Sequence, residues 1–277
     1  MIRILFVGDV FGRTGRDMAR RALRVIDRSI APDLVVANVE NAAAGAGITR
    51  ETGDALLSYG VDVMTSGNHV WDKREALAYI GAEPRLLRPL NMKDAAPGHG
   101  VYVARLATGQ PAGIINAMGR VFMPPLDDPF AAVDAAIERL RRECRTIVVD
   151  FHAEATSEKL AMGWHLDGRV TAVVGTHTHV QTSDARLFPG GTAYITDVGM
   201  TGPHDSVIGM RREGALRRFL TGLPSKLEPA EENPRFQAVL IAADEGSGRA
   251  SAIERIDWST ADVARARESL DDTDGER

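Results

Sequence analysis

The amino-acid sequence predicts one layered α/β sandwich, and two patterns lead to this prediction. Short runs rich in β-branched residues alternate with segments of helical periodicity, which is typical of βαβ units. Several of these runs, such as IRILFV and TIVVDF, are almost wholly apolar, so both faces of each strand should be buried. We therefore expect a sheet that is covered by helices on both faces.

The first elements follow directly from this alternation. The expected strands are residues 2–9, 33–41 and 61–69, and the expected helices are residues 14–30, 49–60 and 72–81. After residue 84, Pro and Gly interrupt the pattern, and ATGQP within residues 100–121 predicts a hairpin turn between two strands. We expect these two strands to flank the main sheet.

The second half of the chain continues with one clear helix and further strands. A helix is expected over residues 129–143, because Ala131, Val133, Ala136, Ile137 and Leu140 share one face. Three more strands are expected at 146–152, 170–177 and 191–199, and a strand pair within 236–256 closes the domain. We expect a single domain, residues 1–258, and then a polar tail, residues 259–277, that forms a short helix with a frayed end.

Composition excludes several classes of protein. The 33 basic and 38 acidic side chains give a formal charge of −5, and this balance provides no strong signal for nucleic-acid binding. The only cysteine, Cys144, cannot form a disulfide framework or a Cys-rich zinc site. No run of consecutive apolar residues approaches the length of about 18 that a membrane-spanning helix needs. We expect a cytoplasmic protein without membrane association, and the sequence leaves a homo-oligomer open.

Polar residues occur where the apolar strands end. They are Asp9, Glu40, Asn41, Asn68, His69, His152, His177 and His179. In an open α/β sheet, ligands bind beyond the carboxyl ends of the strands, so these side chains should converge on one crevice. Leaving His69 aside, they offer two carboxylates, two amides and three imidazoles, too many ligands for one tetrahedral zinc. The set suits two metal ions about 3.5 to 4 Å apart.

Each of these residues also has an ordinary structural explanation. Asp9 could be a helix N-cap or a turn residue, and His152 a buried histidine hydrogen-bonded to Asp150 or Glu154. The two histidines of THTH should point to the same side of a strand, but alone they are equally consistent with satisfied polar residues at a sheet end. Because several such residues occur together at the strand ends, we favour metal binding over these separate explanations.

The order of the motifs, GD, VEN, GNH, a single His and GTHTH, resembles the calcineurin-like metallophosphoesterase superfamily. Two positions depart from the usual pattern: Phe11 stands where a D-x-H motif has its histidine, and VEN replaces an aspartate motif. With both departures, and with GDVFGRTGR and TDVGMTGPHDSVIG, the chain is similar to the YmdB-like branch of that superfamily.

The resemblance implies a metallophosphoesterase fold and two ligand sets that share Glu40 as a bridge. One ion would be held by Asp9, Glu40, Asn41 and His179, with Asn41 replacing the missing histidine. The other would be held by Glu40, Asn68, His152 and His177. His69 would remain free as the catalytic general acid or transition-state stabiliser. Mixed nitrogen and oxygen ligation without thiolate permits Fe, Mn, Co or Zn. We expect Fe and/or Mn, with Zn, Co or Mg also open.

The resemblance further implies a phosphodiesterase that hydrolyses small diesters, 2',3'-cyclic nucleotides above all, by attack of a metal-bridging hydroxide. A TIM-barrel amidohydrolase also uses H-x-H at a strand end, but in its first strand, whereas here the motif comes late. The non-enzymatic alternative is a regulatory protein or one associated with RNA metabolism, in which hydrolysis is incidental. The Gly/Arg loop after Asp9 and His204 remain open as substrate contacts.

Overall fold

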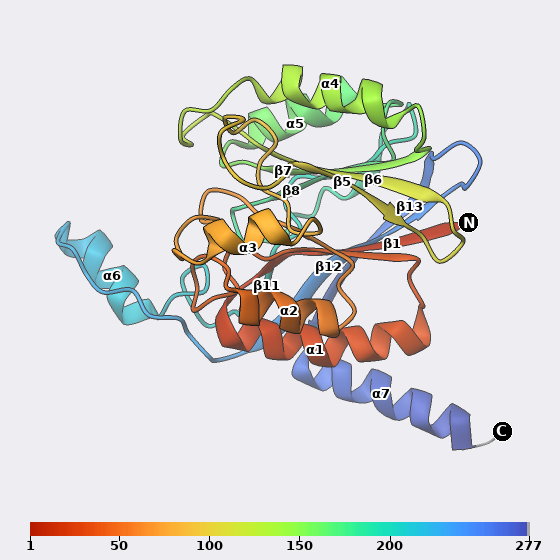
Figure 1. The fold of residues 1–277 in the computed structure, drawn as a ribbon. Helices are drawn as coiled ribbons and strands as arrows, with labels where there is room; N and C mark the ends of the chain where they lie inside the picture. The colour runs from red at the N-terminus through yellow and green to blue at the C-terminus, as the bar shows by residue number, and fades with distance from the viewer. Residues whose placement is uncertain (276–277) are drawn as a thin grey trace.

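The computed structural model describes residues 1–275 and contains two β-sheets packed face to face, with helices on the outer face of each sheet. Figure 1 shows the four layers: α4 and α5 above, the two sheets in the middle, and α1 and α2 below. The predicted layered α/β sandwich is therefore confirmed.

The first sheet has seven strands in the order β2-β11-β12-β1-β3-β4, with β13 paired to β12. The bounds are β1 Ile2–Val7, β2 Asp9–Val10, β3 Leu34–Asn38, β4 Val63–Thr65, β11 Met200–Pro203, β12 Pro234–Ala243 and β13 Ala250–Ser259. Strands β1, β3 and β4 run parallel, so their carboxyl ends lie at one edge of the sheet.

The second sheet has six strands in the order β5-β6-β7-β8-β10-β9. The bounds are β5 Val101–Arg105, β6 Pro111–Met118, β7 Thr146–His152, β8 Ala172–Thr176, β9 Arg186–Leu187 and β10 Ala193–Ile195. The central strands β6, β7, β8 and β10 are parallel. The predicted hairpin joins β5 and β6, which pair antiparallel, but β6 continues the second sheet and does not flank the first.

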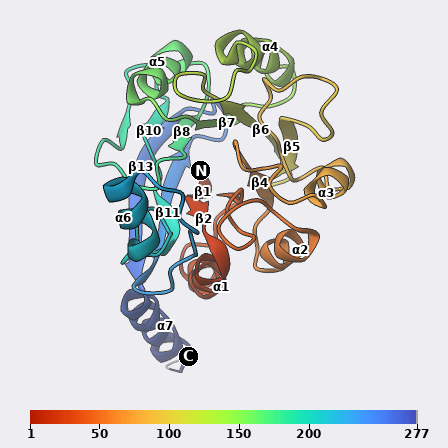
Figure 2. The same ribbon diagram turned by 90° about the vertical axis from the view of Figure 1, so that its left-hand side faces the viewer.

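The helices occupy the outer layers. Their bounds are α1 Gly12–Ser29, α2 Arg50–Ser58, α3 Ala76–Ala82, α4 Pro129–Leu140, α5 Thr156–Leu166, α6 Arg212–Thr221 and α7 Thr260–Gly275. Two helices, α5 and α6, were not expected from the sequence. In α5, Glu158 and Lys159 are buried while Trp164 is exposed, which obscures the amphipathic pattern. Helix α6 projects from the body and buries only Ala215, so it has no apolar core face (Figures 1 and 2).

The all-apolar strands are buried on both faces, but not by helices on both. In β1, Ile2, Ile4 and Phe6 face the second sheet, whereas Leu5 and Val7 belong to the cluster under the helices of the first sheet. The expectation of one sheet covered by helices on both faces is therefore wrong. The chain forms two sheets, and the inner face of each sheet is covered by the other sheet. Apolar runs alone cannot distinguish these two kinds of cover.

The C-terminal segment forms the helix α7, which packs against α1. Val263 is buried in the cluster under the helices of the first sheet, with Ala266 and Leu270 partly buried beside it. A short helix was expected here, and α7 has 16 residues. The last two residues of the segment expected to fray, 276–277, lie outside the described residues. The division into a domain of residues 1–258 and a tail stays a prediction. No helix among residues 1–275 has the length and apolar character to span a bilayer.

Packing between the sheets can be tested at Phe6, which is fully buried. Phe6→Ala should lower the free energy of unfolding by about 3–5 kcal/mol, because it removes a large apolar side chain and leaves a cavity between the sheets. Phe122→Ala is the matched control, since the Phe122 side chain is 89% exposed and its loss should change stability by less than about 0.5 kcal/mol. Urea unfolding measures both; equal effects would contradict the two-sheet core.

Candidate metal centre

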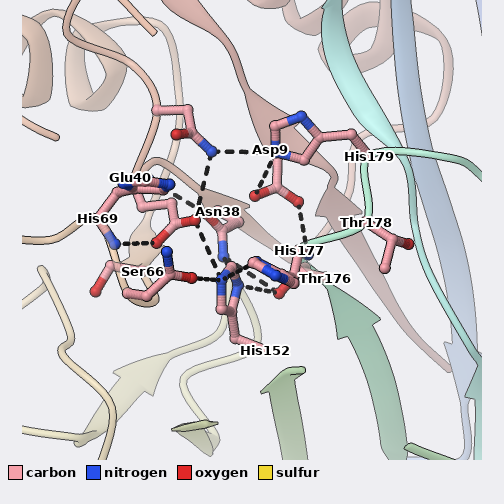
Figure 3. A network of polar contacts seen from close by, with 12 residues as sticks. Asp9, Asn38, Glu40, Ser66, His69, His152, Thr176, His177, Thr178 and His179 are labelled. Carbon is pink, nitrogen blue, oxygen red and sulfur yellow. Dashed lines mark hydrogen bonds and ion pairs between the residues drawn. The ribbon is translucent and has the colours of Figure 1, made fainter. Parts of the chain in front are cut away.

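The predicted site residues lie at the edge where the parallel strands of both sheets end. Asp9 begins β2, Glu40 and Asn41 follow β3, Asn68 and His69 follow β4, His152 ends β7, and His177 and His179 follow β8. Figure 3 shows that side chains from these separate segments form one network of polar contacts. The structure therefore brings together every residue that the sequence assigned to metal binding.

Three atoms of metal-ligand type surround Nε2 of His152. Oδ1 of Asn68 lies 3.0 Å away, Oε1 of Glu40 3.1 Å and Nδ1 of His177 3.1 Å. A single ring N–H cannot donate to all three, so unshared lone pairs face one another in a buried space. Glu40, His152 and His177 form a group whose ligand atoms all lie within 4.8 Å of one another. Such a donor set fits a cation.

A second group of donors lies on the other side of Glu40. Nε2 of His179 is 3.6 Å from Oδ1 of Asp9 and 3.1 Å from the Asn41 amide nitrogen. That nitrogen is also 3.4 Å from Oε1 of Glu40, so Glu40 lies between the two groups. Oδ1 of Asp9 is buried without a hydrogen-bond partner among residues 1–275. A bound cation would satisfy this oxygen, and a 180° rotation of the Asn41 amide would present its oxygen to the same ion.

Outer contacts determine which ring nitrogen of each histidine faces the centre. Nδ1 of His179 donates to the carbonyl of Ile208 at 3.0 Å, which leaves Nε2 as the lone-pair atom. Nδ1 of His152 is 2.9 Å from the Thr176 hydroxyl, and Nε2 of His177 is 3.1 Å from Oε2 of Glu154. Such contacts fix ring orientation and tautomer in metal sites.

The segment that carries His177 and His179 is a strained loop and not the end of a strand. Strand β8 stops at Thr176, and both histidines have positive φ angles, +101° and +63°. Such conformations are costly for non-glycine residues and are concentrated at functional sites. The expectation that the two rings share one side of a strand is wrong; the loop directs each ring separately, His177 toward His152 and His179 toward Asp9.

The buried carboxylates and imidazoles of the centre shift one another's pKa values. Burial raises the pKa values of Asp9 and Glu40, but the neighbouring imidazoles, His179 for Asp9 and His152 for Glu40, outweigh it and hold both below their usual range. Against the effect of burial, the carboxylates raise the pKa of His152 and raise that of His179 to about 9. Burial, with His152 nearby, lowers the pKa of His177 to about 4. Protons and cations would therefore compete for the same donors.

His69 lies apart from this buried cluster. Its side chain is 42% exposed, and Nδ1 is 2.8 Å from Oδ2 of Asp72. Its backbone N–H donates to Oε2 of Glu40 at 2.9 Å. The ring is thus oriented by a carboxylate and accessible to solvent, while the backbone supports the central carboxylate.

Sequence reasoning missed the supporting residues. Asn38, Thr65, Asp150 and Thr176 form a buried network behind His152, in which both threonine hydroxyls donate to the Asp150 carboxylate. Burial, partly offset by His152 and by these hydroxyls, raises the pKa of Asp150 to about 7. Polar residues inside the otherwise apolar strands LVVAN and TIVVDFH were the available signal for this network.

The remaining open residues have mainly structural contacts. Phe11, which replaces the usual histidine, packs edge-on against His179 with ring centroids 5.7 Å apart. Arg16 donates to the carbonyl of Ala42, directly after Asn41. Arg13 is exposed and 3.7 Å from Asp17. Nε2 of His204 donates to the carbonyl of Met200, so its ring is engaged with the backbone.

Comparison with known proteins shows the family of the chain. A family model described as YmdB-like protein matches residues 5–256. The chain is 48% identical over 255 residues to the 2',3'-cyclic-nucleotide 2'-phosphodiesterase of Bacillus subtilis (strain 168), and the match covers 92% of this chain and 96% of the relative.

Two solved structures are similar over almost the whole chain. A hypothetical protein from Thermus thermophilus superimposes with a TM-score of 0.87 at 43% identity, covering 93% of this chain and 99% of the other. A structure described as a novel phosphatase from Mycoplasma pneumoniae gives a TM-score of 0.87 at 35% identity, with 93% of each chain covered. The resemblance expected from the sequence motifs is confirmed, and the chain belongs to the YmdB-like protein family.

Proposed function

We propose that this protein is a dinuclear metal-dependent phosphodiesterase that hydrolyses small phosphodiesters, with 2',3'-cyclic nucleotides as the preferred class. The observation that carries the proposal is the convergence of unshared lone pairs around Glu40, in particular the buried Oδ1 of Asp9 that lacks a hydrogen bond among residues 1–275. The name of the Bacillus subtilis relative, 48% identical, supports the substrate class.

The two groups of contacts support the two ligand sets that the resemblance implies. Asp9, Asn41 and His179 would hold one ion, and Asn68, His152 and His177 would hold the other. Oε1 of Glu40 lies between the two groups, so Glu40 would be shared by both ligand sets. Oxygen and nitrogen donors without thiolate fit Fe or Mn, and also Zn, Co or Mg.

When bound, the metal pair would neutralise phosphoryl charge and lower the pKa of the attacking water. The chain itself supplies the orientation. The His69 backbone N–H fixes one oxygen of Glu40, a residue that would belong to both ligand sets. The His69 ring, with Asp72 at Nδ1, can present Nε2 to the leaving oxygen of a substrate and donate a proton to it. The contact with Asp72 would hold the ring in one orientation for this transfer.

The first prediction concerns substrate choice. Two divalent ions, two carboxylates and an anionic nucleophile leave about one positive charge, which suits a monoanionic diester better than a dianionic monoester. With Mn²⁺ supplied, kcat/KM for 2',3'-cyclic AMP should exceed kcat/KM for AMP. A metal-depleted sample is the control. A monoester preference of about tenfold or more would overturn the phosphodiesterase assignment, and no metal-dependent turnover of either class would favour a regulatory protein.

A second prediction separates proton transfer from ion binding. His69→Ala should lower kcat by about 10² to 10⁴, the usual contribution of a general acid. Metal content should stay that of the parent, because the contact from residue 69 to Glu40 uses the backbone N–H, which alanine retains. Metal analysis and steady-state kinetics measure the two effects. Loss of metal from this variant would assign His69 to the ligands.

A third prediction tests the shared ligand. Glu40→Gln should weaken both ion positions, because the neutral amide removes the charge that both groups of donors face. Asn41→Ala should weaken mainly the position that contains His179, since Asn41 contacts His179 and not His152. Metal equivalents per chain are measured after dialysis against a fixed Mn²⁺ concentration. Two full equivalents in Glu40→Gln together with parental activity would refute the bridge.

A further inference from the structure

A buried ion pair lies behind the loop that carries His177 and His179. Lys159 of α5 is 1% exposed and Asp197 is fully buried, with Nζ of Lys159 2.8 Å from Oδ2 of Asp197. Burying a lysine is costly, and a buried ion pair is rarely more stabilising than an apolar packing of the same volume. Neither residue belongs to the proposed ligand sets or to the pair His69 and Asp72, so the burial of this ion pair requires another explanation.

The Asp197 carboxylate holds the centre of the histidine loop. Its Oδ2 accepts hydrogen bonds from the Thr178 backbone N–H at 3.0 Å and from the Thr178 hydroxyl at 2.7 Å. Thr178 lies between His177 and His179, whose φ angles are +101° and +63°. The ion pair therefore anchors the one residue that separates two strained histidines. The strain needs such an anchor, because the loop would otherwise relax toward common backbone angles.

The same carboxylate also reaches Asp9 through one residue. Oδ1 of Asp197 accepts from the backbone N–H of Gly199 at 2.8 Å, and the carbonyl of Gly199 accepts from the backbone N–H of Asp9 at 3.0 Å. Asp197 thus connects the loop after β8 with the start of β2, which belong to different sheets. The Asp197 carboxylate is therefore connected to three of the proposed ligands, to His177 and His179 through Thr178 and to Asp9 through Gly199.

We propose that Lys159 and Asp197 are positioning residues, which hold Asp9, His177 and His179 at the mutual positions that ion binding requires. The ammonium group of Lys159 lies against the buried Asp197 carboxylate, and this contact holds the carboxylate where it accepts hydrogen bonds from Thr178 and Gly199. The inference rests on the proposed function, since it assigns these residues a role toward the same metal centre. A purely structural pair would contribute to stability without affecting ion affinity in the folded protein.

The test compares ion affinity with stability. Lys159→Met keeps the length of the side chain and removes the charge, and Thr178→Val removes only the hydroxyl donor. Met162→Ala is the matched control: Met162 lies on the same helix, is fully buried, and belongs to the core cluster between the second sheet and its helices. Isothermal titration with Mn²⁺ gives Kd for each ion-depleted variant, and thermal unfolding gives Tm with and without Mn²⁺.

We expect Lys159→Met to weaken Mn²⁺ binding by about 10- to 100-fold, as loss of supporting residues in metal sites does. Its gain in Tm on adding Mn²⁺ should shrink accordingly. Thr178→Val should show a smaller loss of affinity at nearly parental Tm. Met162→Ala should lower Tm but retain the parental Kd.

The outcomes are distinguishable. Parental Mn²⁺ affinity in folded Lys159→Met would overturn the inference, and so would an equal loss of affinity in Met162→Ala. If Lys159→Met does not fold, parental affinity in Thr178→Val overturns the inference and weakened affinity supports it. Failure of the proposed function would be seen in the parent protein itself, which would then bind no Mn²⁺ or show no preferential hydrolysis of diesters.

Discussion

The structure depends on one constraint: the parallel strands of two sheets end at a common edge, at a separation fixed by the apolar layer between them. The first sheet brings carboxylate and amide side chains to this edge, Asp9, Glu40, Asn41 and Asn68, and the second sheet brings imidazoles, His152, His177 and His179. Residues such as Ile4, Phe6, Val148 and Val174 fill the space between the sheets. Because this core is closely packed, the two kinds of donor face each other at contact distance.

Precision at the edge comes from polar groups behind the donors. The Thr176 hydroxyl, the Ile208 carbonyl and the Glu154 carboxylate each engage one imidazole nitrogen, and the His69 backbone N–H engages one oxygen of Glu40. These contacts orient the side chains toward one another, and only the Asn41 amide would need to rotate to present its oxygen to an ion. Preorganisation of this kind is what distinguishes a metal centre from a chance group of acidic residues and histidines.

Much of this could be predicted from the sequence, because it depends on local patterns. The α/β class followed from the alternation of apolar and amphipathic segments, and the convergence of Asp9, Glu40, Asn68 and His152 followed from their positions after strands. The second sheet could not be predicted, since an apolar strand looks the same whether a helix or a sheet covers it. The burial of Lys159 was hidden as well, because its partner Asp197 is 38 residues away and no short pattern connects them. The positive φ angles of His177 and His179 arise from long-range contacts and leave no mark on composition.

The placement of carboxylates and amides on one sheet and of imidazoles on the other has a consequence for folding. Each proposed ion would contact both sheets, so it would act as a crosslink across the sandwich, and only a chain with both sheets docked could bind it. Such binding stabilises the native state by RT ln(1 + [L]/Kd) and leaves partly folded forms unaffected. The donors span residues 9 to 179, so the crosslink would close only after distant parts of the chain had met. Ion occupancy would then report on completed docking of the two halves, and ion depletion would loosen the whole sandwich as well as its edge.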